Sequence, residues 1–231
     1  MPDEIKPPSG WPVAAKAFLV IFSIFIAYAF IRYNILKGVE LIHLPLYVNN
    51  KALALTATAL IGLSYLMGPL ARFWPKIFVP KVHYRKYFGI LGFGIAALHG
   101  LISLLLFSPA NYPKFFLESG KLSMIGELSM LFGVLALFLF AIPAITSLHE
   151  IMQSLGGERW LLSQRIGYIA YVLVLFHVFF MGRESWLNAA GWPKGMLPMS
   201  LVAFIIIAVV LLFRLLVIVL PQAKKTDVVQ V

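Results

Sequence analysis

Two histidines stand inside long apolar runs of the sequence. His99 lies in GILGFGIAALHGLISLLLF, and His177 lies in GYIAYVLVLFHVFFMG. An ionisable side chain at membrane depth is costly, so each is a candidate functional residue. A small residue, Gly92 or Ala170, comes seven positions earlier, two helical turns back on the same face. This pattern predicts two helices that clamp one flat ligand, with haem as the leading candidate.

In this hypothesis His99 and His177 are the two axial ligands of the haem iron. Coordination by two imidazoles fills both axial positions, which is typical of electron transfer rather than oxygen chemistry. Arg183, just past His177, is a candidate partner for a haem propionate, or alternatively an anchor at the membrane interface. A structural alternative is that both histidines only hydrogen-bond neighbouring helices. The small residues of the first run fit either a porphyrin or close helix packing: Gly89, Gly92, Ala96 and Gly100.

The composition predicts an all-α, polytopic membrane protein. The chain has 231 residues, of which 61% are hydrophobic and 12% charged, and its mean hydropathy is +0.91. We therefore expect a single transmembrane domain over residues 1–231, with its first apolar run retained rather than cleaved as a signal peptide. The absence of cysteine excludes disulfides, iron–sulfur clusters and thiolate metal sites within this chain. The net charge of +10 is attributed to topology and lipid headgroups, not to nucleic acid.

Six apolar runs reach roughly the 20 residues that a bilayer core requires. Proline, glycine and asparagine separate them in segments such as HLPLYVNN, RFWPKIFVPK and SLGGE. The sequence thus predicts a six-helix bundle with the haem between its third and fifth helices. The expected spans are Trp11–Leu36, Ala52–Ala71, Tyr87–Phe107, Ser123–Leu148, Leu161–Gly182 and Met199–Leu220.

The distribution of lysine and arginine predicts the orientation of the bundle. The N-terminal side and the even-numbered loops hold twelve of these residues, and the opposite side holds seven. The loop between the second and third spans is decisive because it has five basic residues and no acidic one. We therefore expect both termini in the cytoplasm and a location in the cell's inner (plasma) membrane. His99 and His177 then both approach the outer side, as a shared ligand demands.

Several stretches resemble the ferric-reductase-like transmembrane domain superfamily, which includes NADPH oxidases and metalloreductases. They are MGPLARF, RKYFGILGFGIAALHG, AITSLHEIMQSLGGERW and QRIGYIAYVLVLFHVFF, and the similarity extends from about Leu53 to Phe180. Within the superfamily, the sequence is most similar to the MsrQ (YedZ) family of haem-binding membrane subunits. The resemblance implies axial histidines on the third and fifth spans, here His99 and His177 respectively.

The same resemblance implies that an inner haem site lacks its ligands. MsrQ-like proteins usually carry a second histidine on the fifth span, and the matching position here is Gln164. The corresponding inner position on the third span falls at Arg85 or Lys86, and none of these side chains ligates haem well. One b-type haem is therefore expected, and a second is not supported. A helix rises about 20 Å from Gln164 to His177. Either another cofactor, a membrane quinol or an unidentified ligand must bridge this gap.

The sequence supports three functions in this order. The first is a haem b electron-transfer subunit, an oxidoreductase component rather than a self-contained catalyst. It would pass electrons from a cytoplasmic flavin reductase (through FMN) or from a quinol (quinone) to an outer-face acceptor such as an MsrP-like periplasmic methionine sulfoxide reductase. The second is a transmembrane reductase of ferric or other metal ions, although the outer loops offer few ligands: Glu40, His43, Glu118 and Glu184. The third is a haem-free membrane scaffold or transporter.

Overall fold

The structure is a computed structural model that describes residues 9–220. Helices make up this part of the chain, and its one β-type pairing is an isolated bridge between Phe116 and Leu122. Six of the described helical segments are long and apolar enough to cross a membrane, which confirms the predicted all-α fold with six spans. The six main helices are α1 (Trp11–Phe30), α2 (Asn50–Phe73), α4 (Tyr84–Leu106), α5 (Met124–Thr146), α6 (His149–Leu187) and α7 (Met199–Val219).

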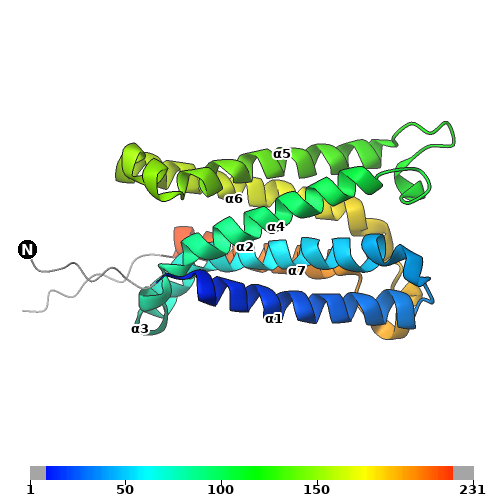
Figure 1. Cartoon of the computed structure of the whole chain (residues 1–231), viewed down its shortest axis with the longest axis horizontal. Helices are drawn as coiled ribbons and strands as arrows, with labels where there is room; N and C mark the ends of the chain where they lie inside the picture. Colours follow the sequence, from blue (N-terminus) through cyan, green and yellow to red (C-terminus); the bar gives the residue numbers. More distant parts are fainter. Residues whose placement is uncertain (1–8, 221–231) are drawn as a thin grey trace, which may run out of the picture.

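The six helices run alternately up and down along the long axis of the molecule (Figure 1). The beginning of α1 and the end of α7 lie at the same end as the short helix α3 (Pro75–Phe78). We call this the inner end, since the sequence predicts that it faces the cytoplasm. Helices α4 and α6 both run away from it. Residues in their second halves, including His99 and His177, therefore lie toward the opposite, outer end.

Helix α2 forms the centre of the bundle. In its most hydrophobic stretch 67% of the residues are buried, against at most 28% in any other span. It packs against α1, α4 and α7. The Tyr171 hydroxyl of α6 also donates a 2.9 Å hydrogen bond to the carbonyl of Thr58 on α2. Gly62 makes room for this hydroxyl, because a Cβ at that position would lie 2.9 Å from it.

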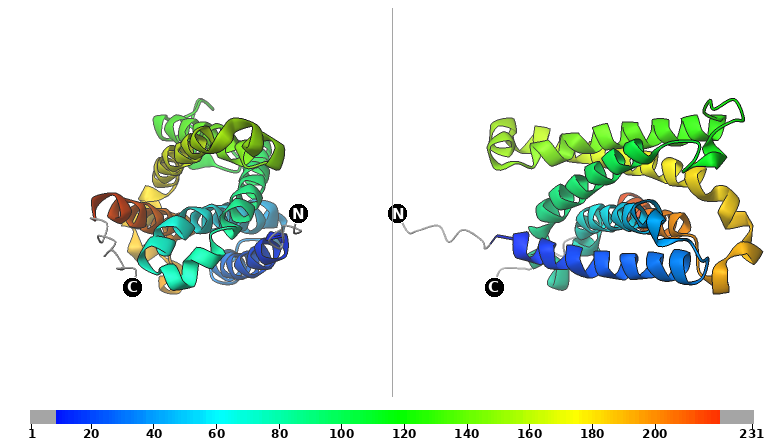
Figure 2. Two further views of the ribbon diagram at one scale, coloured as in Figure 1. Left: turned by 90° about the vertical axis from the view of Figure 1, so that its left-hand side faces the viewer. Right: turned by 45° about the vertical axis from the view of Figure 1, so that its right-hand side comes forward.

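Helices α5 and α6 pack together on the side of the molecule opposite α1 and α2 (Figure 2), and α6 also packs against α7. Helix α4 crosses obliquely between the two groups, packing closely along α2 and less extensively against α5. By contrast, α4 and α6 have no extensive contact with each other. The two helices that carry His99 and His177 are therefore held by third partners rather than by one another.

Two predicted loops are helical in the structure. SLGGE lies within α6, which begins at His149 rather than near Leu161 and is interrupted only at Gly156, where φ is 71°. Glycine tolerates this left-handed conformation, so the chain turns there without ending the helical segment. Much of HLPLYVNN likewise forms a π-helix, Pro45–Asn49, that leads directly into α2. Proline suits the first position of a helix because it has no N–H to satisfy.

The close approach of α4 to α2 gives a stability prediction. A Cβ on Gly92 would lie 2.8 Å from Ile61 Cγ1 and 3.0 Å from the Ile61 backbone nitrogen, whereas a Cβ on Gly94 would meet nothing within 4 Å. We expect Gly92→Leu to lower the free energy of unfolding by about 1–3 kcal/mol through overpacking. Gly94→Leu is the matched control and should have little effect. Unfolding titrations in mixed micelles measure both, and equal losses would contradict this packing.

Candidate haem site

His177 is held by the backbone of α5. Its Nδ1 lies 2.8 Å from the carbonyl oxygen of Ser129 and 3.3 Å from the Ser129 hydroxyl. In a helix the Cβ of residue i+4 lies over the carbonyl of residue i, and at that position α5 carries Gly133. A Cβ on Gly133 would lie only 2.8 Å from His177 Nδ1. The glycine therefore leaves the Ser129 carbonyl open to the imidazole.

His99 is held by a side chain at the start of α2. Its Nδ1 lies 2.8 Å from Asn50 Oδ1, and Asn50 Nδ2 donates a 3.0 Å hydrogen bond to the Ser103 hydroxyl. Ser103 is one turn beyond His99 on α4, and its hydroxyl is also 3.4 Å from the His99 Nδ1. Asn50 is 1% exposed, so the amide is committed to these two partners. Asn50 thus ties α2 to the outer half of α4.

These contacts select one tautomer for both histidines. A carbonyl oxygen can only accept, so Nδ1 of each ring carries the proton and Nε2 keeps its lone pair. No described residue hydrogen-bonds Nε2 of His99 or His177. A histidine bonded through Nδ1 with a free Nε2 is the usual arrangement of an imidazole that ligates a metal. Histidines that serve only as helix contacts would be expected to satisfy both ring nitrogens.

The relative position of the two histidines also fits a ligand shared between helices. Both are half-buried, and both lie in the outer halves of helices that run in the same direction. Haem iron can take up to two axial donors besides its porphyrin nitrogens, and the two free Nε2 atoms would supply that number. The residues present therefore fit a haem with two imidazole ligands. Among residues 9–220, no cluster of three or more His, Asp or Glu side chains could hold a metal ion without a porphyrin.

The small residues predicted to admit a flat ligand have protein neighbours in the structure. A Cβ on Gly89 would approach Ser64, one on Gly92 would approach Ile61, and one on Gly100 would approach Leu137. These glycines therefore allow α4 to pack closely on α2 and α5. Ala170 is 0% exposed and lies in the hydrophobic core. The geometry favours helix packing for Gly92 and Ala170, and a haem contact at either residue stays a prediction.

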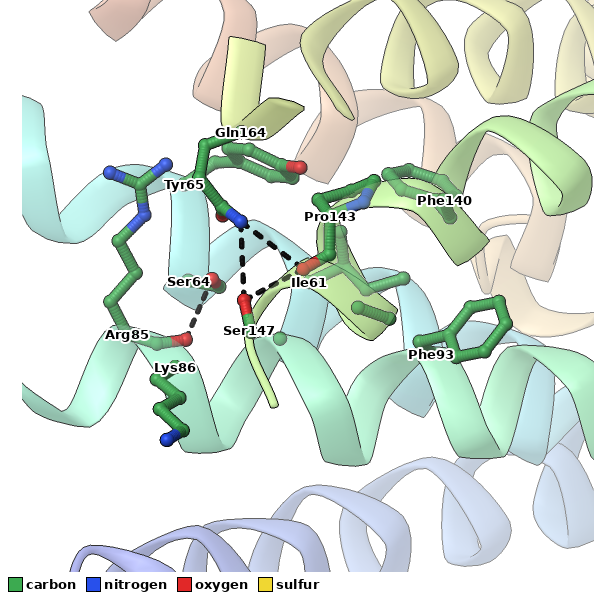
Figure 3. Close-up of a pocket in the computed structure, with 12 residues that line it drawn as sticks. Ile61, Ser64, Tyr65, Arg85, Lys86, Phe93, Phe140, Pro143, Ser147 and Gln164 are labelled. Carbon is green, nitrogen blue, oxygen red and sulfur yellow. Dashed lines mark hydrogen bonds between the residues drawn. The ribbon is translucent and has the colours of Figure 1, made fainter. Parts of the chain in front are cut away.

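The inner half of the bundle contains a pocket between α2, α4, α5 and α6 (Figure 3). Its lining includes the three residues that the sequence predicts at the empty inner position: Arg85, Lys86 and Gln164. The Arg85 guanidinium lies on the same side as Tyr65, 5.7 Å from the centre of its ring, whereas Lys86 points away from Gln164. The cavity volume is about 30 Å³, enough for one or two water molecules.

Gln164 is tied into this pocket by the end of α5. Its Nε2 donates to the Pro143 carbonyl and to the Ser147 hydroxyl, both at 3.1 Å. The Ser147 N–H bonds the Ala144 carbonyl rather than that of Pro143, so the Pro143 carbonyl lacks its usual helical donor. The Ser147 hydroxyl, at 2.7 Å, and the Gln164 amide supply replacement donors. The amide is thus a structural link between α5 and α6 at the level where MsrQ-like proteins carry a histidine.

Charged and phenolic groups gather near the outer end of α4 and α6. Burial raises the pKa of the Tyr112 hydroxyl, and the neighbouring Asn50 amide opposes part of that shift. Burial also lowers the pKa of Lys114, which donates a 2.5 Å hydrogen bond to the carbonyl of Met181. Arg183, the predicted propionate partner, has no hydrogen bond or aromatic contact within the described part of the chain. Its predicted role stays untested.

The sequence analysis missed the residues that orient the two histidines. Asn50 was assigned to a loop, and Ser129 and Gly133 were not singled out. The available signals were a polar residue at the start of an apolar run, and a serine and a glycine four residues apart in the fourth span. Both patterns also occur in helices packed only for structure. Their role becomes visible only when the opposing histidine is placed.

Comparison with known proteins identifies the class. The sequence profile of the family described as "Ferric reductase like transmembrane component" matches residues 53–175, which include His99 and Gln164 and end two residues before His177. This chain belongs to that family. It is also similar to metalloreductases: 24% identical to human Metalloreductase STEAP2 over 87% of this chain and 48% of the human protein. It is 28% identical to rat Metalloreductase STEAP3 over 75% of this chain and 42% of the rat protein.

The chain spans less than half the length of these relatives. Their similarity therefore concerns the part of each relative that this chain matches. The predicted membership of the ferric-reductase-like superfamily is confirmed. The closer kinship with the MsrQ family stays a prediction, since the relatives reported above are metalloreductases.

The Asn50 contact gives a prediction about the site. Replacing a residue that orients a metal-ligating histidine typically weakens metal binding 10- to 100-fold. We expect Asn50→Leu to weaken haem binding by about this factor, because His99 loses the acceptor that fixes its ring and tautomer. Haem titration of the apoprotein measures the affinity. Asn34→Leu is the control: that amide bonds the Val39 carbonyl in the loop after α1. Equal affinities in the two variants would show that Asn50 does not position His99.

Proposed function

We propose that this protein holds one b-type haem between His99 and His177 and conducts electrons across the membrane. The observation that carries the proposal is the pair of imidazoles on α4 and α6, each with Nδ1 bonded and Nε2 free. Bound there, the haem would supply reversible one-electron chemistry. The residues of this chain hold its two axial positions, exclude water with apolar helices and fix both imidazole orientations. The protein then acts as an oxidoreductase component that carries electrons.

We propose that the electron acceptor binds at the outer face, the side toward which the outer halves of α4 and α6 extend. Membership of the ferric reductase family and similarity to two metalloreductases favour a ferric or other metal ion as this acceptor. The described residues contain no cluster of three metal-binding side chains. The metal ion would therefore bind only transiently, as the substrate to be reduced. An MsrP-like methionine sulfoxide reductase is the alternative acceptor, and it rests only on the resemblance to MsrQ.

We propose that electrons reach the haem by way of the inner pocket. About 20 Å of helix separates Gln164 from His177. An electron donor that stays outside the membrane is therefore too far from the haem to reduce it directly. A flavin such as FMN, delivered by a cytoplasmic reductase, or a membrane quinone is a flat ring with carbonyl acceptors. The Arg85 guanidinium offers donors beside the aromatic ring of Tyr65. The pocket would widen by rotation of Arg85 and Lys86, whose side chains are half-buried.

These roles require both termini and the basic α2–α4 loop to face the cytoplasm. The proposed location is the inner (plasma) membrane, with the lipid bilayer around the exposed apolar faces of α1, α4, α5 and α7. Twelve of the 19 lysines and arginines on the inner side support this orientation.

Transmembrane electron transfer can be measured in sealed vesicles. The full chain is reconstituted with reduced flavin inside, and a ferric chelate with a ferrous-specific dye outside. We expect ferrous iron to form outside with the wild-type protein and to fall to the protein-free rate with His99→Ala or His177→Ala. His83→Ala, an exposed histidine of the inner α2–α4 loop, is the control and should retain the wild-type rate. Unchanged rates in both axial variants would refute a haem path through these residues.

The inner pocket can be tested separately from the haem. We expect Arg85→Gln to slow reduction by flavin or quinol at least tenfold, because the ring loses its guanidinium donors. The absorption spectrum of the haem should stay as in wild type, since Arg85 does not touch the histidines. Stopped-flow reduction measures the rate. Arg159→Gln, an exposed basic residue at the inner end of α6, is the control. A variant that is reduced as fast as wild type excludes this pocket as the donor site.

A further inference from the structure

Two lysines approach the outer end of the histidine pair from different parts of the chain. Lys114, in the loop between α4 and α5, donates to the carbonyl of Met181, which is one turn beyond His177 on the same face of α6. Lys51 follows Asn50, the residue that accepts from His99. Lys114 therefore contacts the helical turn that follows His177. Lys51 is the residue next to Asn50, which bonds the His99 ring.

Neither lysine has a carboxylate partner within residues 9–220. The Lys51 ammonium lies between the rings of Tyr33 and Tyr47, 4.1 and 4.3 Å from their centres. Its charged neighbours are cations, Lys37 and Arg32. The carboxylate of Glu184 raises the pKa of Lys114, but burial and the charge of Lys51 outweigh it. Lys51 is half-buried and Lys114 is exposed, so the cost of an unpaired charge falls mainly on Lys51. An anionic group beside the two ammonium groups would relieve that cost.

We propose that Lys51 and Lys114 bind the two propionate carboxylates of the haem. This assignment rests on the proposed function, since it requires a haem between His99 and His177. A b-type haem carries both propionates on one edge. We place that edge toward the outer side, because the aromatic rings of Tyr65, Phe140 and Tyr171 pack together on the inner side. The outer side offers two ammonium groups for two carboxylates.

Helix geometry favours Lys114 over Arg183 for this role. Arg183 comes six residues after His177, which turns it about 240° around the helix, away from the imidazole face. Met181 comes four residues after His177, at about 40°. Lys114 reaches α6 at Met181, so its ammonium lies on the same face as His177. The sequence alone could not indicate Lys114, because it lies in a loop 63 residues before His177 in the chain.

Two positive charges beside the haem have a measurable consequence. They stabilise the state that carries the additional electron and thereby raise the midpoint potential. Charge-assisted hydrogen bonds to the propionates also retain the haem in the protein. Removal of either lysine should therefore lower the potential and speed haem loss, while the axial ligands stay the same.

The test uses the full haem-loaded protein in nanodiscs. Lys51→Met and Lys114→Met should each lower the midpoint potential and release haem to apomyoglobin about tenfold faster, with unchanged low-spin resonance signals. Lys51→Arg and Lys114→Arg keep the charge and should restore most of both properties. Lys121→Met, an exposed lysine of the same outer loop, is the control and should behave as wild type.

Loading with haem dimethyl ester, whose propionates are blocked, completes a double-substitution cycle. In wild type the ester should change the midpoint potential and the rate of haem loss as the Met variants do. In the double variant Lys51→Met with Lys114→Met, the ester should cause little further change in either quantity. Full additivity of the ester and the lysine variants would overturn the assignment, as would Met variants with wild-type potential and haem loss. A chain that binds no haem would overturn the proposed function itself, and so the two failures are distinguishable.

Discussion

Hydrogen bonding at Nδ1 of two histidines inside the membrane is the constraint on which the site depends. An imidazole surrounded by apolar helices needs a polar partner, and each partner here comes from a different neighbouring helix. Asn50 on α2 accepts from His99, and the Ser129 carbonyl on α5 accepts from His177. These bonds leave Nε2 of each ring free. They also explain why α4 and α6 need no extensive contact with one another: each is fixed by its own partner.

The two ends of this site differ in what surrounds them. Toward the inner end, Gln164 donates its amide to the Pro143 carbonyl, and so α5 and α6 are joined where a second ligand would stand in the MsrQ family. Toward the outer end, Lys51 and Lys114 bring positive charge, and neither forms a salt bridge within the described residues. An electron path in this chain would therefore combine a polar, hydrogen-bonded inner pocket with a cationic outer edge.

The sequence predicted the features that depend on local composition. Six apolar runs gave six spans, and the resemblance placed the chain in the family that the comparisons identify. Helix boundaries were less predictable: Gly156 looked like a loop residue, yet it turns within α6 because a single positive φ is enough. His99 and His177 were identifiable because a histidine in an apolar run is costly. Asn50, Gly133 and Lys114 were not, since their roles depend on contacts with residues that are distant in sequence.

The small residues illustrate the same limit in physical terms. Gly92 precedes His99 by two turns, and sequence spacing cannot distinguish room for a porphyrin from room for another helix. In the structure a Cβ there would collide with Ile61 of α2. Gly133 attracted no attention in the sequence, yet it is the glycine that opens a carbonyl to His177. The spacing of glycines thus indicates that something packs closely against the helix, but it does not distinguish a ligand from another helix.

The most direct test of this account is the haem content of the purified full-length protein, measured as the pyridine haemochrome together with low-temperature electron paramagnetic resonance. The account predicts one b-type haem per chain with the low-spin signal of two imidazole ligands. A colourless protein, a high-spin signal from a single imidazole, or two haems per chain would contradict it.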